Sequence, residues 1–125
     1  IKMTTESNKR KTVRISYACY ITIWEAGGFN TFVANAVNIG GGGVLVTLDQ
    51  GIMIGAKVDL KIEFSQNSSF ECIGRVLRCK KYNKSQESDK DFFTVAIVFD
   101  SLNHQQEIFL NNKIEEILKI ENKIT

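Results

Sequence analysis

Catalytic motifs are missing from this sequence of 125 residues. It contains one histidine, His104, with no nucleophile or acid at the spacing of a known catalytic motif. No HExxH, GxSxG or paired-cysteine motif occurs. We therefore expect a protein that is not an enzyme, with His104 exposed in the first turn of a helix.

Cysteine is scarce, and its spacing fits no zinc site. The three cysteines are Cys19, Cys72 and Cys79, an odd number without a metal-binding pattern. If Cys72 and Cys79 share one strand, their odd separation places them on opposite faces, where they cannot pair. The sequence predicts buried, reduced thiols in a cytoplasmic protein, and no metal site.

A large excess of one charge is also absent, since the formal net charge is only +2. Proteins that coat a nucleic-acid polymer carry a larger positive excess, so we expect no such partner. No apolar run approaches the roughly 18 residues of a membrane span, and no signal peptide is visible. Locally, however, basic residues crowd the first fourteen positions against the single acid Glu6: Lys2, Lys9, Arg10, Lys11 and Arg14.

Most of the chain follows the two-residue period of β-strands. Val58, Leu60, Ile62 and Phe64 alternate with charged residues, which is typical of a half-solvated antiparallel strand. Residues 80–91 are predicted to form a polar loop. The expected strands cover 17–24, 29–37, 44–46, 58–64, 70–79 and 93–99. About six short strands predict a barrel or a sandwich.

After Asp100 the period changes to that of a helix. Apolar residues recur at helical spacing, and Asn103 with Gln106 forms a possible capping box at the start. We expect the apolar face to pack on the barrel and close it, although a dimer interface is an alternative. The apolar residues are Leu110, Ile114, Ile117 and Leu118. We divide the chain into an arm, 1–8, and one domain, 9–122.

Two short motifs stand out in the first third of the chain. The first is Arg10-x-x-x-Arg14 on the basic segment, and the second is Asn38-x-Gly40-x-x-Gly43 at a strand junction. The glycine run is neither a P-loop nor a dinucleotide fingerprint, because no G-K-[S/T] ending and no helix follows it. Taken singly, the first motif reads as a solvated basic tail and the second as a tight turn or bulge.

Taken together, their order and distance resemble the PilZ family, whose signature is R-x-x-x-R followed by [D/N]-x-S-x-x-G. The downstream sequence also resembles the family, in Gly43-Val44-Leu45-Val46, Gly74-Arg75-Val76 and Val95-Ala96-Ile97-Val98-Phe99. The resemblance implies an all-β fold, a six-stranded antiparallel PilZ-like β-barrel with a C-terminal α-helix. It also implies that the ligand is cyclic di-GMP.

The resemblance assigns a role to each motif residue. Arg10 and Arg14 would grip phosphate and stack on guanine, because a guanidinium is planar and carries a fork of donors. Asn38 would read a guanine edge. Gly40 and Gly43 would let the backbone approach closely, and Lys9 would add a secondary contact. Gly40 stands where the family has serine, and a lost neutral hydrogen bond weakens binding by about 3- to 10-fold.

The sequence thus predicts a bacterial, cytoplasmic second-messenger receptor with no cofactor, whose arm closes over cyclic di-GMP. It would act through a downstream protein partner, as a monomer or a homodimer. One alternative is a degenerate PilZ domain that binds no nucleotide and works through protein contacts. Another is a small barrel for single-stranded nucleic acid, with Tyr17, Tyr20 and Trp24 as stacking platforms instead of core or cross-strand packing.

Overall fold

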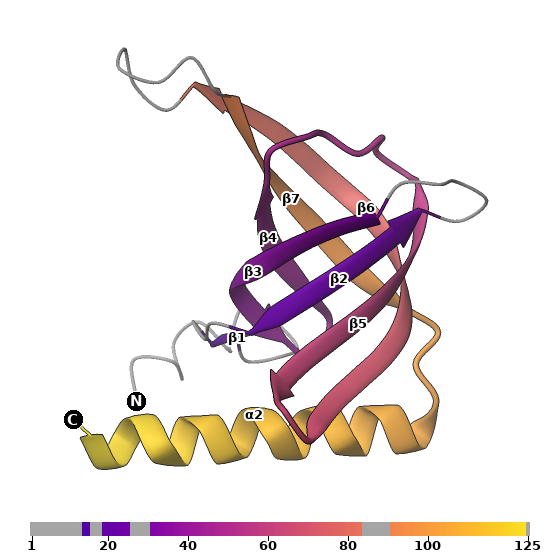
Figure 1. Ribbon diagram of the computed structural model, residues 1–125. Helices are drawn as coiled ribbons and strands as arrows, with labels where there is room; N and C mark the ends of the chain where they lie inside the picture. Colours follow the sequence, from indigo (N-terminus) through magenta and orange to yellow (C-terminus); the bar gives the residue numbers. More distant parts are fainter. Residues whose placement is uncertain (1–13, 16–18, 26–30, 84–90, 125) are drawn as a thin grey trace.

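The computed structural model describes residues 14–15, 19–25, 31–83 and 91–124. These residues form strands and one long helix at the C-terminal end (Figure 1). The elements are β1 (Arg14–Ile15), β2 (Tyr20–Glu25), β3 (Thr31–Gly40), β4 (Gly43–Leu48), β5 (Lys57–Ser65), β6 (Ser68–Asn83), β7 (Asp91–Asp100) and α2 (His104–Ile124).

Six of the strands close into a barrel. Neighbours follow the order β3-β2-β5-β6-β7-β4, and β4 pairs again with β3 to complete the ring. Every pairing is antiparallel, and the short β1 lies beside the end of β3. The predicted fold class, an all-β six-stranded antiparallel barrel with a C-terminal α-helix, is therefore confirmed.

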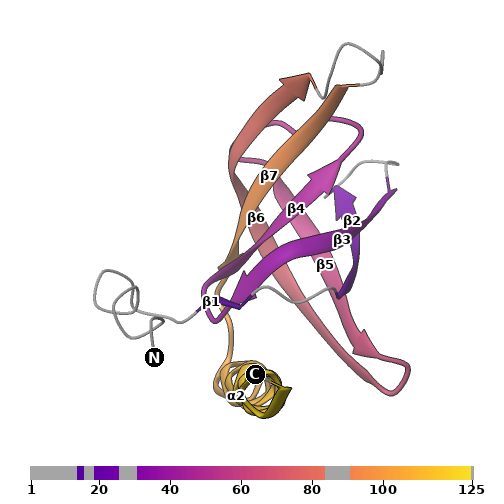
Figure 2. The same ribbon diagram turned by 90° about the vertical axis from the view of Figure 1, so that its left-hand side faces the viewer.

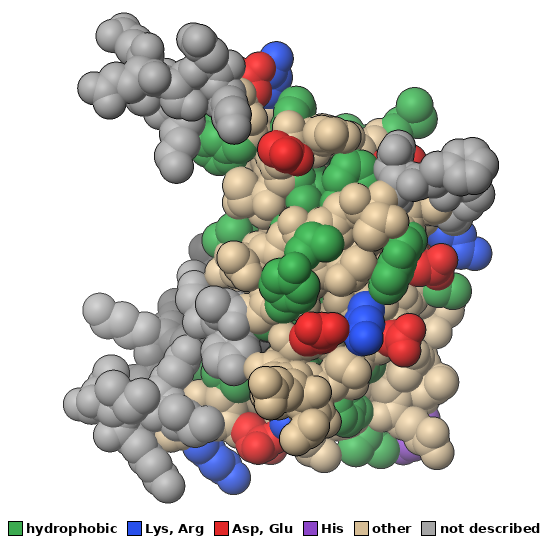
Figure 3. Space-filling view, viewed as in Figure 1, with side chains coloured by type: hydrophobic (Ala, Val, Ile, Leu, Met, Phe, Trp, Pro, Cys, Tyr) green, Lys and Arg blue, Asp and Glu red, His purple; other side chains and the backbone are tan. Residues whose placement is uncertain are grey.

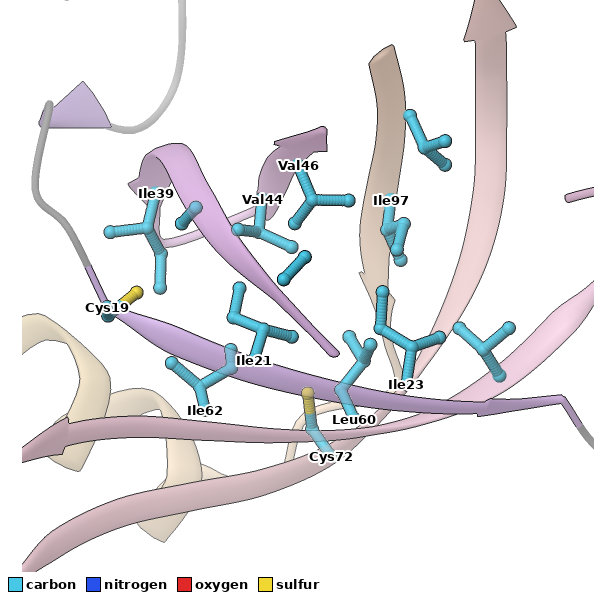
Figure 4. Close-up of a cluster of buried hydrophobic side chains, with 14 of the residues drawn as sticks. Cys19, Ile21, Ile23, Ile39, Val44, Val46, Leu60, Ile62, Cys72 and Ile97 are labelled. Carbon is cyan, nitrogen blue, oxygen red and sulfur yellow. The ribbon is translucent and has the colours of Figure 1, made fainter. Parts of the chain in front are cut away.

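Alternation along the strands builds the core. Val58, Leu60 and Ile62 of β5 are at most 1% exposed. The side chains of Leu60 and Ile62 lie beside those of Ile21 and Ile23 of β2 inside the barrel (Figure 4). The residues between them are charged and face outward, so the outer surface mixes acidic and basic side chains (Figure 3). The same alternation places Tyr20 and Trp24 on the outer face, beside the buried Ile21 and Ile23.

The helix begins with the predicted capping box. The backbone N–H of Gln106 donates to Oδ1 of Asn103 at 2.8 Å, and the N–H of Asn103 donates to Oε1 of Gln106 at 2.9 Å. Helix α2 then runs across one end of the barrel (Figures 1 and 2). Leu110, Ile114 and Ile117 are buried in the core cluster, which confirms that this face closes the barrel.

Aromatic rings fix the first half of α2 to the barrel. The ring of Phe109 stacks on that of Phe70 with centroids 5.9 Å apart, and Phe99 meets Phe70 edge-on at 6.1 Å. Nearby, Nε2 of Gln106 donates to the carbonyl oxygen of Glu71 at 2.8 Å. The capping residue therefore also attaches the helix start to β6.

No helix among the described residues is long and apolar enough to cross a membrane.

The predicted polar loop over residues 80–91 is shorter than expected. Strand β6 continues to Asn83, and β7 begins at Asp91. Contacts between the two strands explain the extension: Tyr82 stacks on Phe92 with centroids 5.3 Å apart, and Lys81 pairs with Asp91 at 3.1 Å. Cross-strand pairs thus keep a polar segment in strand conformation.

The prediction that Cys72 and Cys79 face opposite sides of one strand was wrong. Both lie on β6, but the pairing with β7 shifts by one residue between Val76 and Arg78. This bulge reverses the alternation, so Cys79 packs against the same core as Cys72. Both remain free thiols.

Candidate functional site

The structure brings the end of the arginine motif to the glycine motif. Strand β1 lies beside the end of β3 (Figure 2). In this pairing Arg14 is the Cα partner of Gly40, and Ile15 is the partner of Ile39. Taken singly, the first motif predicts a solvated basic tail, but the backbone of Arg14 forms the start of this pairing. Lys9 and Arg10 lie outside the described residues, as does the side chain of Arg14.

A bulge in β3 turns Asn38 away from the core. Ala36 pairs with Val46, but the register shifts before Asn38 pairs with Leu45 and Ile39 with Val44. As a result Ile39 is fully buried, whereas Asn38 is half-buried on the outer side. Without the extra residue, Asn38 would follow Ala36 into the interior.

Gly43 is required by the packing of the barrel itself. A Cβ atom at this position would lie 2.4 Å from the carbonyl oxygen of Ile97 on β7, closer than any side chain tolerates. Next to it, the N–H of Phe99 donates to the carbonyl oxygen of Gly42 at 2.9 Å. The glycine therefore lets β4 and β7 approach where the barrel closes. Gly40 is buried at the end of β3.

The bulge in β6 presents a further basic residue, Arg78, that our reading of the sequence did not single out. Arg78 pairs with Ala96, which pairs with Leu45, which pairs with Asn38. These four residues form one row on the outer side of β3, β4, β7 and β6. We call this surface the bulged face, because a bulge sets the direction of the polar residue at each end.

A small pocket lies on the bulged face. It is lined by Gly42, Gly43, Leu45, Leu77, Arg78 and Val98, among others. Among the described residues Arg78 has no acidic partner, whereas neighbouring Arg75 donates to the carbonyl oxygen of Gly55 and lies 3.6 Å from Asp100. The pocket holds only about 40 Å³, so it suits a flat ring that lies across its mouth, where the unpaired guanidinium can stack on the face of the ring.

Among the described residues, the titratable groups whose pKa is clearly shifted are two buried cysteines. Burial raises the pKa of the Cys19 thiol to about 11, partly offset by a backbone hydrogen bond, and raises that of Cys72 to about 12. Both thiols are therefore neutral near pH 7 and poor nucleophiles. His104 is exposed at the start of α2, as predicted. Within the described residues no group of histidine, cysteine and acidic side chains could hold a metal ion.

Comparison with known proteins identifies the family. The family model of the PilZ domain matches residues 8–116, which is most of the chain. The chain belongs to the PilZ family. The matched range covers both motifs, so Arg10, Arg14, Asn38, Gly40 and Gly43 all fall within it.

Solved structures show the same fold. The PilZ domain of YcgR from Escherichia coli, solved with c-di-GMP, is 13% identical with a TM-score of 0.75, over 92% of this chain and 95% of that one. The K. pneumonia MrkH–c-di-GMP complex is 9% identical with a TM-score of 0.77, over 93% of this chain and 55% of that one.

A Bacillus subtilis structure, the inhibitor of motility MotI/DgrA, is 21% identical with a TM-score of 0.62 over 89% of this chain. The chain spans about half of MotI/DgrA and of MrkH, at 52% and 55% of their lengths. None of the curated proteins matches this chain significantly.

Proposed function

We propose that this PilZ domain is a non-enzymatic receptor for cyclic di-GMP in the bacterial cytoplasm. The observation that carries the proposal is the pairing of Arg14 with Gly40, which joins the two halves of the family's signature at one end of the bulged face. The solved relatives named with c-di-GMP support the choice of ligand. The ligand acts alone, without a cofactor.

The residue types fit a dianion that carries two guanine rings. Arg10 and Arg14 bind phosphate and stack on guanine, Asn38 reads a guanine edge, and Lys9 adds charge. Each charge-assisted contact contributes about 1.5–3 kcal/mol, and stacking of a cation on a ring adds about 0.5–2 kcal/mol. Gly40 and Gly43 let the backbone approach the ligand closely, while Arg78 supplies a cation from the barrel side.

Calorimetric titration tests this function. We expect cyclic di-GMP to bind the intact protein, and Arg10→Ala/Arg14→Ala to weaken the affinity by at least roughly 100-fold, the loss of about 3 kcal/mol. The matched control is Lys2→Ala/Lys11→Ala, which removes two charges from the same segment but leaves the motif intact. Titration of the intact protein without heat, or equal losses in the two variants, contradicts the proposal.

Binding of the ligand orders the basic segment against the barrel and changes the surface offered to a protein partner. Limited proteolysis follows this step directly. Saturating ligand is expected to slow cleavage between Lys9 and Arg14, a stretch that also contains the trypsin sites Arg10 and Lys11. Cleavage at an unchanged rate would argue against closure of the arm even if calorimetry detects binding.

A degenerate PilZ domain that works through protein contacts alone is the second candidate. Gly40 favours it, because the position lacks the hydroxyl of the family's serine and is buried against β1. The retained Arg10, Arg14, Asn38 and Gly43 favour binding. The same calorimetric titration of the intact protein separates the two candidates.

A further inference from the structure

Strand β6 extends beyond the end of its pairing with β5, one of its two neighbours. Its pairing with β5 ends where Lys57 meets Arg75, and the last bonds on that side join Val76 to Gly55 and Ala56 at 2.8 and 2.9 Å. Its pairing with β7 continues to Asn83. Within the described part of the chain, β6 therefore has a strand neighbour on one side only over residues 77–82. We call this segment the free edge of β6. It belongs to the two-stranded extension that rises past the barrel (Figures 1 and 2).

The direction of the backbone groups on the free edge follows from β7. The N–H of Phe99 points to β4, where it donates to Gly42. Alternate residues of β7 point the same way, so Ala96, Thr94 and Phe92 point to β6 instead. Their partners Arg78, Lys80 and Tyr82 bond to β7. The N–H and C=O groups of Cys79 and Lys81 consequently point away from β7, to the side where β6 has no strand.

The positive charge of the free edge favours an acidic partner. Lys80 and Lys81 are exposed, and only Lys81 pairs with an acid, Asp91, among the described residues. Nζ of Lys80 lies 5.3 Å from the centroid of the Tyr82 ring. A second copy of the chain would bring like charges together, which opposes edge-to-edge pairing. An extended segment with acidic side chains would instead be attracted.

Exposed apolar side chains lie where the free edge begins. Met53 and Ile54 are 81% and 62% exposed in the turn before β5. This turn is held by the bond from Ala56 N–H to the Met53 carbonyl oxygen at 3.0 Å, and by the bond from Gly55 to Val76. Flexible methionine side chains adapt readily to an apolar partner. A strand added in line with β5 would pass beside both residues.

We propose that the free edge of β6 binds an extended acidic segment of a partner protein as an added strand. The N–H and C=O groups of Cys79 and Lys81 bond to its backbone, while Lys80 and Lys81 attract its carboxylates. Met53 and Ile54 contact an apolar side chain at the end nearest the barrel. Arg78 lies within the segment, but it bonds to β7 and makes no contact with the added strand. The contacts with the added strand are made by residues that are not assigned to cyclic di-GMP, so either proposal can fail alone.

A peptide probe tests this edge in the intact protein. The probe is a short acetylated and amidated peptide that alternates valine with glutamate, titrated into isotope-labelled protein at low salt and followed by amide resonances. The expected result is shifts and slowed hydrogen exchange at Cys79 and Lys81. A peptide with lysine in place of glutamate is expected to cause neither. Absence of shifts at the free edge, or shifts there only with single-stranded oligothymidylate, overturns the proposal.

Two substitutions of one residue separate backbone pairing from charge. Lys81→Ala removes the charge and keeps the outward N–H, so we expect about 3-fold weaker binding of the acidic peptide. Lys81→Pro also removes the N–H without breaking the bonds to β7, and we expect roughly 10-fold further weakening. Equal affinities of the two variants would contradict strand addition. Should the proline variant misfold, the shift map of the intact protein still decides.

Discussion

The helix-capped end of the barrel and the bulged face are built by opposite means. At the capped end, the side chains of β5 alternate between core and solvent along the whole strand, and the register with β6 shifts only at the hairpin, between Glu63 and Ser65. Helix α2 closes the interior there with a capping box and the Phe109–Phe70 stack. On the bulged face, β3 and β6 each carry an extra residue. There Asn38 and Arg78 point outward at positions that strict alternation would bury.

We infer that this difference separates the residues that stabilise the fold from those that contact the proposed ligand. Residues at the capped end satisfy local preference and packing together, as expected where a protein only has to stay folded. Each bulge on the other face interrupts a hydrogen-bonded ladder and in return redirects one polar side chain. Substitutions at the capped end should therefore alter the free energy of unfolding, and substitutions on the bulged face should alter affinity.

The strongest test of this separation is Phe109→Ala. The substitution removes a ring that stacks on Phe70 and lies 6.5 Å from Phe64, so we expect a loss of about 3 kcal/mol in the free energy of unfolding. Urea denaturation measures the loss, and calorimetry below the transition should find unchanged affinity for cyclic di-GMP. The control is Ile108→Ala at the neighbouring, 46% exposed position, which should cost less than about 0.5 kcal/mol. Reduced affinity in the folded Phe109 variant would show that the two regions are coupled.

The second largest effect should be a fall in the free energy of unfolding at alkaline pH. Burial raises the pKa of Cys72 from 9.0 to about 12, so above pH 9 the thiol ionises in the unfolded chain while the folded protein keeps its proton. The free energy of unfolding should thus be unaffected by this thiol below pH 9, then fall by up to about 1.4 kcal/mol per pH unit towards pH 12. Urea denaturation from pH 7 to 10.5 under reducing conditions should show a shallower fall for Cys72→Ala. Parallel curves for the two proteins would mean that Cys72 does not contribute.

The elements at the capped end could be predicted from the sequence, because the residues that indicate them lie close together in the chain. The strand expected over 58–64 is found at Lys57–Ser65, and the pair Asn103 and Gln106 marked the start of α2 correctly. Alternation and capping each involve residues close together in the chain. Nothing from the partner strand is needed to recognise them.

The bulged face could not be read in this way, because a bulge depends on the register with a distant strand. Alternation carried past Val76 assigns Arg78 to the core and Cys79 to solvent, the reverse of what is found. The one indication of a bulge in the sequence was the charged residue Arg78 on an otherwise apolar face. The pairing of Arg14 with Gly40 likewise has no local signal, and only the resemblance to PilZ domains linked the two motifs.

The smallest expected effect tests the departure of this chain from its family. Gly40→Ser restores the family's hydroxyl beside β1, and one neutral hydrogen bond to the ligand should raise the affinity for cyclic di-GMP by about 3- to 10-fold. The free energy of unfolding should change much less than in the Phe109 variant, because Gly40 lies at the end of β3 and the substitution removes no packed side chain. Gly42→Ser, in the same turn but outside the signature, is the matched control for calorimetry. Weaker binding by the Gly40 variant would mean that the glycine is needed for the close approach of β1, and that this domain binds its ligand without the hydroxyl.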